Sequence, residues 1–376
     1  MKVLFITHYS SMYGANKSLI NLIEGLRVYD VDILVLCPED GALVENLKNL
    51  NVNHIVRKFS NAHHKTTRSL FKVPFKLFSN LIFLLKSGWV KEFAPDVIYS
   101  NSSVVFIGSL LSWKYNIPHI WHIREFGYLD YKLKFDFGSS FLTYWRKKTS
   151  KFICISNAIS ETVLPNVSIE KKFIIYNGIV RKMELEQYTV RSLKTDQRMI
   201  LGIVGLVSPV KNQLEAIRAF AIVNKVYPLT VLRIIGDGDG EYLDLLSLEA
   251  GKLGVRDSVI FEGYMSDPSS VYDDLDILLM CSRNEGMGRV TVEAMSRGIP
   301  TVGYANGGTL ELINDGQNGF LYNNGYEKLS SKVMELLGNK SLYIQMSEAC
   351  LREVERKFTV EEYSKKVSEV LFGLKN

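Results

Sequence analysis

The chain has 376 residues and a mass of 42.7 kDa, which is enough for two domains of ordinary size. Its residues are 47% hydrophobic and 23% charged, a balance that excludes fibrous, low-complexity and polytopic membrane chains. The charge is uneven, because residues 1–180 carry a net charge of +9 and the remainder carries −4.

The first half of the chain alternates between short β-branched or aromatic runs and amphipathic segments. The expected elements are strand 2–7, helix 17–26, strand 31–36, strand 97–99, helix 104–113, strand 119–122 and strand 152–155. This alternation predicts an α/β domain with a parallel sheet and helices on both faces.

A second series begins near Met199. The expected elements are a strand at 199–205, helix 213–226, strand 230–235, helix 241–253, strand 259–262, strand 277–280, a helix after Gly288, strand 301–303 and helix 361–371. The polar stretch 180–197 lacks periodicity and is interpreted as a linker. We therefore expect two Rossmann-like domains, 1–180 and 181–358, with residues 359–376 packing back on the first. Ligands of such sheets bind beyond the carboxyl ends of the strands, so the expected site is a cleft between the domains.

Cysteine spacing and the N-terminus bear on the compartment. The cysteines, Cys37, Cys154, Cys281 and Cys350, form no CxxC pair, which predicts neither a zinc site nor a disulfide framework and favours a reduced, cytoplasmic setting. The short N-terminal apolar run favours a strand over a signal peptide. No uncharged apolar stretch reaches the roughly 20 residues that span a bilayer.

The strongest motif is the segment 282–295, SRNEGMGRVTVEAM, in which a strand leads through two glycines into a helix. Backbone N–H groups at such a helix start attract phosphate. Glu285 and Glu293 flank this pocket and suit the hydroxyls of a sugar or ribose better than a phosphate. The same residues also fit an ordinary helix start with acidic capping, and the motif alone does not separate the two readings.

Two loops of the second half add to this motif. Lys211 follows the first strand of that half and could neutralise a diphosphate, although it could equally be a solvated surface lysine. Gly236 ends another strand in the run IGDGDG, which is either an open floor for a ligand or a tight turn. Neither a dinucleotide fingerprint nor a P-loop is present.

The first half contributes a loop and a histidine. Gly14 and Ala15 join the first strand to the first helix. His122 is expected at the carboxyl end of a strand, where it would recognise hydroxyls or move a proton; a satisfied, partly buried histidine is the equally weighted alternative.

Together these motifs resemble the retaining glycosyltransferase family 4, which has the GT-B fold of two Rossmann-like domains facing each other across a deep cleft. The resemblance covers nearly the whole chain in family order. It rests on Gly14-Ala15, Trp121-His122, Asn177-Gly178-Ile179, Lys211, Gly236-Asp237-Gly238, Phe261-Glu262-Gly263-Tyr264 and the segment from Glu285 to Glu293.

The resemblance implies a nucleotide diphosphosugar donor bound by the second domain and an acceptor bound by the first. His122 and Glu285 match residues at the reacting centre, and Gly14 and Ala15 match the acceptor and phosphate loop. The implied donor-binding residues are Lys211, Gly236, Tyr264, Met265, Gly286, Met287, Gly288, Arg289, Val290 and Glu293, of which Tyr264 and Met265 would lie by the nucleobase.

The family pattern also sets expectations about chemistry. It implies a hexosyl transfer with retention at the anomeric carbon, no cofactor and no bound metal, in the synthesis of a bacterial surface polysaccharide or glycolipid. Leu206 stands where the family usually has an arginine that helps with the diphosphate, and Arg289 is a candidate to compensate. A sugar-nucleotide epimerase of the same fold and a non-catalytic nucleotide-sugar-binding protein are the alternatives. No nucleic-acid role is expected.

A basic amphipathic stretch lies in the presumed acceptor domain. Residues 46–91 contain nine Lys or Arg and no Asp or Glu, and within 65–91 Arg68, Lys72 and Lys76 recur at helical spacing opposite an apolar face. With the aromatic and basic stretch 131–148, this predicts contact with an anionic membrane surface and a peripheral enzyme on the inner face of the plasma membrane, acting on a glycan or lipid-linked acceptor. A core-facing helix with a solvated basic face is the alternative.

Overall fold

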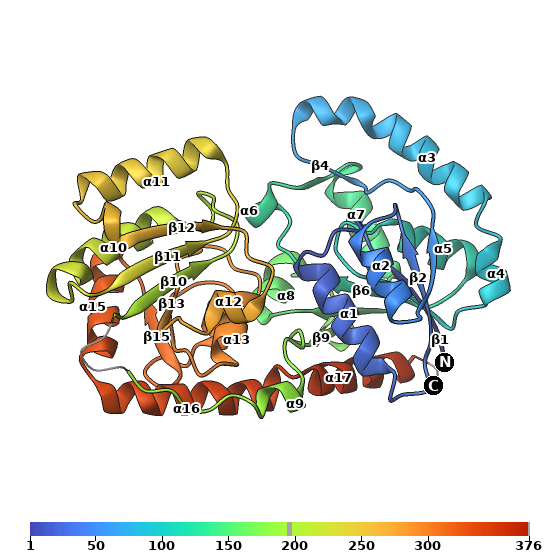
Figure 1. Cartoon of the computed structure of the whole chain (residues 1–376). Coiled ribbons are helices and arrows are strands. Elements are labelled where there is room, and N and C mark those ends of the chain that lie inside the picture. Colours follow the sequence, from blue (N-terminus) through green and yellow to red (C-terminus); the bar gives the residue numbers. More distant parts are fainter. Residues whose placement is uncertain (194–197, 375–376) are drawn as a thin grey trace. The chain divides into compact units, whose positions relative to one another are not determined.

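The computed structural model describes residues 1–193 and 198–374, apart from the side chains of residues 67–69. The chain forms two compact units (Figure 1). Unit 1 consists of Met1–Gly178 together with the C-terminal segment from Val360, and unit 2 is Ile179–Thr359. The expected boundaries at 180/181 and 358/359 lie within two residues of these positions. Of the expected linker 180–197, residues 182–185 are helical, and residues 194–197 lie outside the described residues.

Unit 1 is built on a parallel sheet with the strand order β3-β2-β1-β5-β6-β8-β9. These strands are β1 (Lys2–Ile6), β2 (Asp32–Cys37), β3 (Asn53–Val56), β5 (Val97–Ser100), β6 (His119–Ile123), β8 (Lys151–Cys154) and β9 (Lys172–Ile174). Strand β1 lies inside the sheet and is buried on both faces. Its side chains alternate between two cores: Val3 and Phe5 enter one, and Leu4 and Ile6 enter the other.

Helices cover both faces of this sheet. They are α1 (Gly14–Leu26), α2 (Ala42–Asn49), α3 (Val73–Leu85), α4 (Trp89–Phe93), α5 (Ile107–Tyr115), α6 (Tyr128–Tyr131), α7 (Gly138–Lys148), α8 (Asn157–Val163) and α17 (Val360–Phe372), with the 3-10 turns η1 (Thr67–Lys72) and η2 (Ile169–Lys171). The helix expected at 104–113 begins at Ile107 instead, because Ser102 Oγ accepts the Val104 N–H in a turn before it.

A small antiparallel pair, β4 (His63–His64) and β7 (Lys134–Phe135), joins two distant segments of unit 1. Asp136, directly after β7, is fully buried and accepts from His64 Nδ1 at 2.8 Å and from Lys76 Nζ at 2.9 Å. Since Lys76 belongs to α3, this carboxylate fastens α3 to the segment that leads into α7.

The C-terminal helix α17 packs on α1 within unit 1. Its buried residues Tyr363, Val367 and Leu371 share a core with the buried face of α1. Gly25 permits this approach, since a Cβ there would lie 2.6 Å from Ser364 Cβ.

Unit 2 repeats the architecture with the strand order β12-β11-β10-β13-β14-β15, all parallel. Its strands are β10 (Ile200–Val204), β11 (Val231–Ile235), β12 (Val259–Gly263), β13 (Ile277–Met280), β14 (Thr301–Tyr304) and β15 (Gly319–Tyr322). Its helices are α9 (Lys182–Leu185), α10 (Gln213–Val226), α11 (Gly240–Lys252), α12 (Pro268–Tyr272), α13 (Arg289–Met295), α14 (Thr309–Leu312), α15 (Tyr326–Leu337) and α16 (Lys340–Lys357), with the 3-10 turn η3 (Arg256–Ser258).

Both sheets reverse their strand order at one point. In unit 1 this point lies between β1 and β5, and in unit 2 it lies between β10 and β13. In doubly wound sheets, the carboxyl edge beside such a reversal is where ligands ordinarily bind. The motif residues Gly14 and Ala15 follow β1, Lys211 follows β10, and Glu285 follows β13.

Candidate active site

The carboxyl edge of the unit 2 sheet is closed by glycine backbone. Gly236 has φ +143°, and a Cβ there would lie 2.0 Å from the carbonyl oxygen of Gly205. Its N–H donates to the carbonyl of Gly263 at 2.8 Å. The ends of β10 and β11 therefore meet with no room for a side chain at Gly236, whereas Gly205 and Gly263 are favoured by their positive φ of +132° and +70°.

A predicted donor-binding residue, Lys211, and a predicted catalytic residue, Glu285, form a direct ion pair beside this edge. Lys211 Nζ lies 2.6 Å from Glu285 Oε2, and both side chains are only partly exposed. The structure thus brings together a cation and a carboxylate that are 74 positions apart in the sequence.

Glu293 is held from two sides. Arg289 Nε lies 2.9 Å from its Oε1 one helical turn earlier in α13, and the Tyr272 hydroxyl donates to its Oε2 at 2.7 Å. Burial, followed by the Glu293 carboxylate, holds the pKa of Tyr272 well above its ordinary value, so the phenol stays protonated and keeps donating. Tyr272 was missed from the sequence because nothing local ties α12 to α13.

The loop between Glu285 and α13 is supported from below by a second pair of glycines. The Gly308 N–H donates to the Glu285 carbonyl at 2.7 Å, and a Cβ on Gly307 would lie 2.6 Å from the same carbonyl. Gly288 adopts φ +87° directly before α13. Of the predicted donor residues in this loop, Met287 is buried and Gly286 is half-buried, so Met287 supports the loop from the core side.

The predicted nucleobase residues follow β12. Tyr264 is exposed, and its N–H donates to Asp237 Oδ1 at 3.1 Å. Met265 is half-buried, with its sulfur 3.7 Å from an Arg233 nitrogen. Arg233 itself is paired with Glu262, Nε to Oε1 at 2.6 Å. The exposed Tyr264 side chain is therefore more accessible to a ligand than the half-buried Met265 side chain, which packs beside this pair.

In unit 1 the structure places His122 at the carboxyl end of a strand, as the sequence predicts. It is the penultimate residue of β6, and its side chain is fully buried. Its Nδ1 is 2.6 Å from the Tyr99 hydroxyl, and burial holds the pKa of His122 well below its ordinary value. The imidazole is therefore neutral, and among the described residues its Nε2 has no hydrogen-bond partner. It is more deeply buried and less fully hydrogen-bonded than the satisfied, partly buried histidine that was the alternative.

Arg124 and Glu125 directly follow the carboxyl end of β6. Arg124 is buried and donates to Asn101 Oδ1, to Asn177 Oδ1 and to the Tyr363 hydroxyl of α17. Glu125 accepts from the Ser103 N–H at 2.9 Å and the Ser103 hydroxyl at 2.6 Å, and burial raises its pKa. Sequence reasoning missed both, although a charged pair directly after an apolar strand was a readable signal.

Gly14 and Ala15 were expected in a loop, but they form the first turn of α1, because the helix begins three residues earlier than predicted. Gly14 is exposed and Ala15 is half-buried. The Ala15 carbonyl accepts from Asn101 Nδ2 at 3.3 Å. Asn16, fully buried, donates to the carbonyls of Tyr9 and Ser11 and so fixes the turn between β1 and α1. Within residues 1–193 and 198–374, no group of three or more His, Cys, Asp or Glu side chains could hold a metal ion; metal independence stays a prediction.

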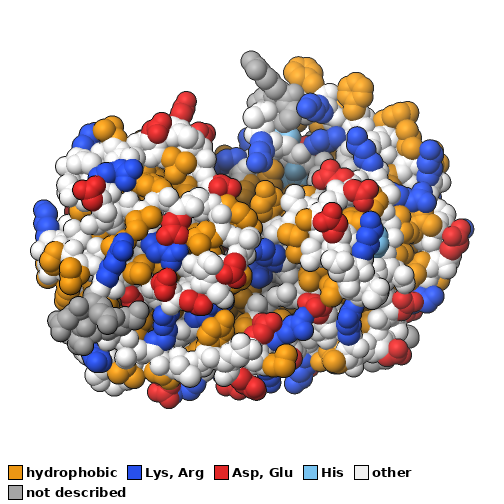
Figure 2. Space-filling model, viewed as in Figure 1, with side chains coloured by type: hydrophobic (Ala, Val, Ile, Leu, Met, Phe, Trp, Pro, Cys, Tyr) orange, Lys and Arg blue, Asp and Glu red, His pale blue; other side chains and the backbone are white. Residues whose placement is uncertain are grey.

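The basic segments of unit 1 present an apolar surface. Most large apolar side chains of η1, α3, α6 and α7 are exposed, among them Phe71 at 82%, Phe75 at 76% and Leu85 at 74%. Figure 2 shows hydrophobic side chains interspersed with Lys and Arg over α3. The predicted basic face is corrected in part: Lys72 is exposed, but Lys76 turns inward to Asp136, and the side chain of Arg68 lies outside the described residues. None of the described helices is long and apolar enough to cross a bilayer.

Comparison with known proteins covers both units. Residues 12–181 match the family model Glycosyltransferase Family 4, and residues 186–352 match the model Glycosyl transferases group 1. An uncharacterized glycosyltransferase of Haemophilus influenzae is 26% identical over 92% of this chain and 92% of its own length. The UDP-Gal:alpha-D-GlcNAc-diphosphoundecaprenol alpha-1,3-galactosyltransferase of Escherichia coli is 24% identical over 100% of this chain and 97% of its own length.

The fold also matches solved structures. The Anabaena protein HepE, solved in complex with UDP, superposes with a TM-score of 0.80 at 21% identity, covering 99% of this chain and 100% of its own. The two Rossmann-like units are therefore those of the GT-B fold. With family models matching both halves of the chain, this protein belongs to glycosyltransferase family 4 and is a glycosyltransferase.

Proposed function

We propose that this glycosyltransferase moves a hexose from a nucleotide diphosphosugar to a hydroxyl of a glycan or lipid-linked acceptor, with retention and without a metal. The reaction would serve the synthesis of a surface polysaccharide or glycolipid, at the inner face of the plasma membrane. The observation that carries the proposal is the pairing at the unit 2 edge, where Lys211 meets Glu285 and Glu293 is held by Arg289 and Tyr272.

These ion pairs fit a donor site because each charged side chain could give up its present partner and bind a group of the donor instead. The diphosphate would take the ammonium of Lys211 and the backbone N–H groups of 286–290, which supply the charge stabilisation that a leaving diphosphate needs. Lys211 would then release Glu285, whose carboxylate can accept from hydroxyls of the transferred sugar. Arg289 would supply the second cation that is absent at Leu206.

Glu293 would accept from the ribose hydroxyls. Its Oε2 already has the Tyr272 hydroxyl as a donor, which fixes the carboxylate and leaves its remaining lone pairs for the ligand. Retention would follow from a displacement on one face of the sugar, in which the leaving phosphate helps to deprotonate the acceptor. His122 would act at most through its Nε2, which has no hydrogen-bond partner among the described residues.

The acceptor side of the proposal depends on unit 1. The exposed apolar side chains of α3 stand beside exposed cations such as Lys72 and Lys86, a pattern that binds anionic membrane surfaces. The Escherichia coli relative is named for a diphosphoundecaprenol-linked acceptor, which supports a lipid-linked acceptor for this chain as well.

Calorimetry with UDP-, GDP-, ADP- and TDP-sugars tests the donor site. One nucleotide class should bind, and Glu293→Gln should weaken its binding by about tenfold or more, because a carboxylate acceptor is lost. Glu241→Gln, an exposed change elsewhere in unit 2, is the matched control. NMR of the product reports the anomeric configuration, and turnover with excess EDTA tests metal independence. Equal binding by Glu293→Gln and the unchanged chain would refute the assigned site.

Sedimentation with vesicles tests the membrane contact. Vesicles of phosphatidylglycerol and phosphatidylcholine should bind the protein at low salt, and Phe75→Ser should reduce binding while leaving donor affinity unchanged. Val226→Ser, an exposed apolar change on unit 2, is the control. Indifference of the unchanged protein to these vesicles would contradict this part of the proposal.

A further inference from the structure

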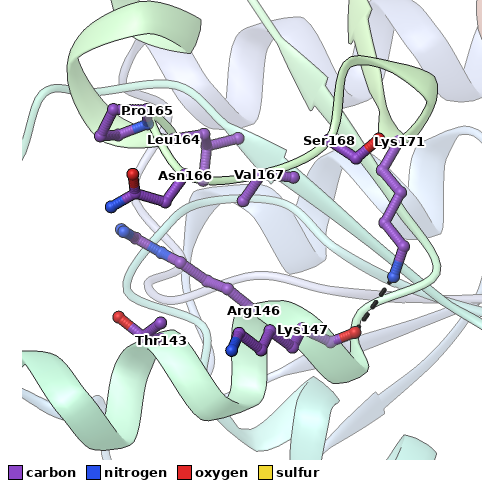
Figure 3. A pocket seen from close by; sticks show the side chains of 9 residues that line it. All are labelled: Thr143, Arg146, Lys147, Leu164, Pro165, Asn166, Val167, Ser168 and Lys171. Atoms are coloured by element: carbon purple, nitrogen blue, oxygen red, sulfur yellow. Dashed lines mark hydrogen bonds between the residues drawn. The ribbon is translucent and has the colours of Figure 1, made fainter.

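Unit 1 contains a pocket whose lining includes none of the residues assigned to the donor site. Its lining consists of Thr143, Arg146, Lys147, Leu164, Pro165, Asn166, Val167, Ser168 and Lys171. Thr143, Arg146 and Lys147 stand at helical positions i, i+3 and i+4 on α7, so they share one face. The chain that follows α8 forms the opposite wall (Figure 3).

The charge of this lining has one sign. It holds three cations, Arg146, Lys147 and Lys171, and no carboxylate. Lys171 is occupied, since its Nζ donates to the carbonyls of Lys147 and Thr149 at 3.0 Å each. One acid next to the lining is Glu170, whose Oε2 accepts from Ser168 Oγ at 3.3 Å.

Arg146 is the unexplained group. It is half-buried, and among the described side chains none forms an ion pair or hydrogen bond with its guanidinium. Charged groups taken out of water are ordinarily paired. Burial lowers the pKa of Arg146 to about 10, which leaves it charged at neutral pH.

Figure 3 shows where the guanidinium lies. It extends along the pocket, away from Lys171, toward the end where Asn166 and Thr143 stand. A planar fork of N–H donors with a hydroxyl and an amide beside it fits an anion with several acceptor oxygens. A carboxylate would use only part of this set, whereas a phosphate group could use all of it.

We propose that this pocket binds a phosphate group, mono- or diesterified, with Arg146 as its principal partner and Thr143, Asn166 and Lys147 around it. The phosphate comes either from a soluble phosphate ester or from the headgroup of a lipid, because the same α7 belongs to the aromatic and basic stretch of unit 1. The site is independent of the donor-binding residues of unit 2.

Calorimetric titration of the whole chain with inorganic phosphate, at constant ionic strength, tests the site. Saturable binding is expected, and Arg146→Gln should weaken it by about tenfold or more because the fork is lost. Lys148→Gln is the matched control, since Lys148 is an exposed cation of the same helix that does not line the pocket. It should change the affinity by less than about twofold.

Two further variants keep the test informative if Arg146→Gln fails to fold, as judged by circular dichroism. Arg146→Lys keeps the charge but not the fork and should bind phosphate with intermediate affinity. Thr143→Val removes only a hydroxyl and should weaken binding by about threefold. Absence of phosphate binding by the unchanged chain, or equal affinity in all variants, would overturn the proposal.

Vesicles separate the two sources of phosphate. If vesicles of phosphatidic acid and phosphatidylcholine bind less well to Arg146→Gln, and glycerol 3-phosphate competes with them, the site takes a lipid headgroup. If the variant loses inorganic phosphate but binds these vesicles as the unchanged chain does, the site takes a soluble ester. Either result supports the phosphate site.

Discussion

The carboxyl edges of the two sheets are built in different ways. In unit 1 the edge is filled by side chains: the Arg124 guanidinium is buried and donates hydrogen bonds to Asn101, Asn177 and Tyr363. In unit 2 the edge is closed by backbone at Gly205 and Gly236, and its charged side chains stand above it in half-exposed pairs such as Lys211 with Glu285.

This difference indicates which edge can exchange partners with a charged ligand. If a buried, hydrogen-bonded arginine such as Arg124 moved toward a ligand, its present acceptors would lose their hydrogen bonds inside the protein, which is unfavourable. A partly exposed ion pair such as Lys211 with Glu285 costs less to open, because water and an incoming anion can replace the lost partner. Unit 2 is therefore suited to a charged donor, and the Arg124 network acts as a rigid scaffold.

Gly236→Ala should have the largest effect on stability, because it forces apart the backbone of Gly205 and Gly236 at the carboxyl ends of β10 and β11. The new Cβ would fall 2.0 Å from the Gly205 carbonyl oxygen at a φ of +143°, and we expect the free energy of unfolding to drop by about 4 kcal/mol. Urea denaturation measures it. Gly240→Ala, where a Cβ meets nothing within 4 Å, is the control and should stay within about 0.5 kcal/mol.

Lys211→Ala probes the exchangeable pair. Removing the cation that would hold the diphosphate should lower kcat/KM by about 100-fold, or about 3 kcal/mol of transition-state stabilisation. Steady-state kinetics with the donor found by calorimetry measures the loss. Lys252→Ala, an exposed lysine at the end of α11, should be unaffected. A similar rate for Lys211→Ala and the unchanged enzyme would remove Lys211 from the mechanism.

Acid should distinguish the two units, because all six histidines lie between His8 and His122 in unit 1. Burial lowers the pKa of His119 from 6.5 to about 3. The unfolded chain therefore takes up a proton below about pH 6.5 while the folded chain does not, so the stabilisation is complete above pH 6.5 and declines as the pH falls toward 3. At pH 5 this histidine alone should cost unit 1 about 2 kcal/mol.

Hydrogen exchange at pH 7 and pH 5, corrected for the intrinsic rate, measures this loss. Peptides of unit 1 should lose protection at pH 5, and peptides of unit 2 serve as the internal reference. Equal loss in both units would show that the buried histidines do not account for the acid sensitivity.

The smallest effect is expected at the surface of α3. Lys72→Gln and Lys86→Gln should each weaken binding to phosphatidylglycerol vesicles by about 1 kcal/mol at low salt, and the difference should shrink as salt is added. Vesicle sedimentation between low and physiological salt measures this. A loss that does not depend on salt would mean that the lysines act through packing rather than charge.

Much of the fold could be predicted because the signals are local. Helix 213–226 and strand 277–280 were predicted to the residue, since period and flanking turns mark them. The short edge strands β3, β9 and β15 were not predicted. Their few residues carry little period, and pairing with the neighbouring strand is what makes them strands.

The candidate site divides in the same way. The segment from Glu285 to Glu293 was readable because strand, glycine turn and helix follow one another in the chain. Tyr272, which donates to Glu293, and Asp136, which holds Lys76 inward, could not be found. Each depends on a partner that is distant in sequence, and no spacing rule reports such contacts.

The sequence by itself determined the family, the two α/β units and the identity of the charged residues at the unit 2 edge, because these depend on period, order and motif. Only the tertiary structure decided that His122 is enclosed in β6, that Arg124 takes the strand end, and that Arg146 is left in a pocket without a partner. One residue of register along a strand moves a side chain from the core to the site, and burial and pairing are then set by elements that the chain brings together only when it folds.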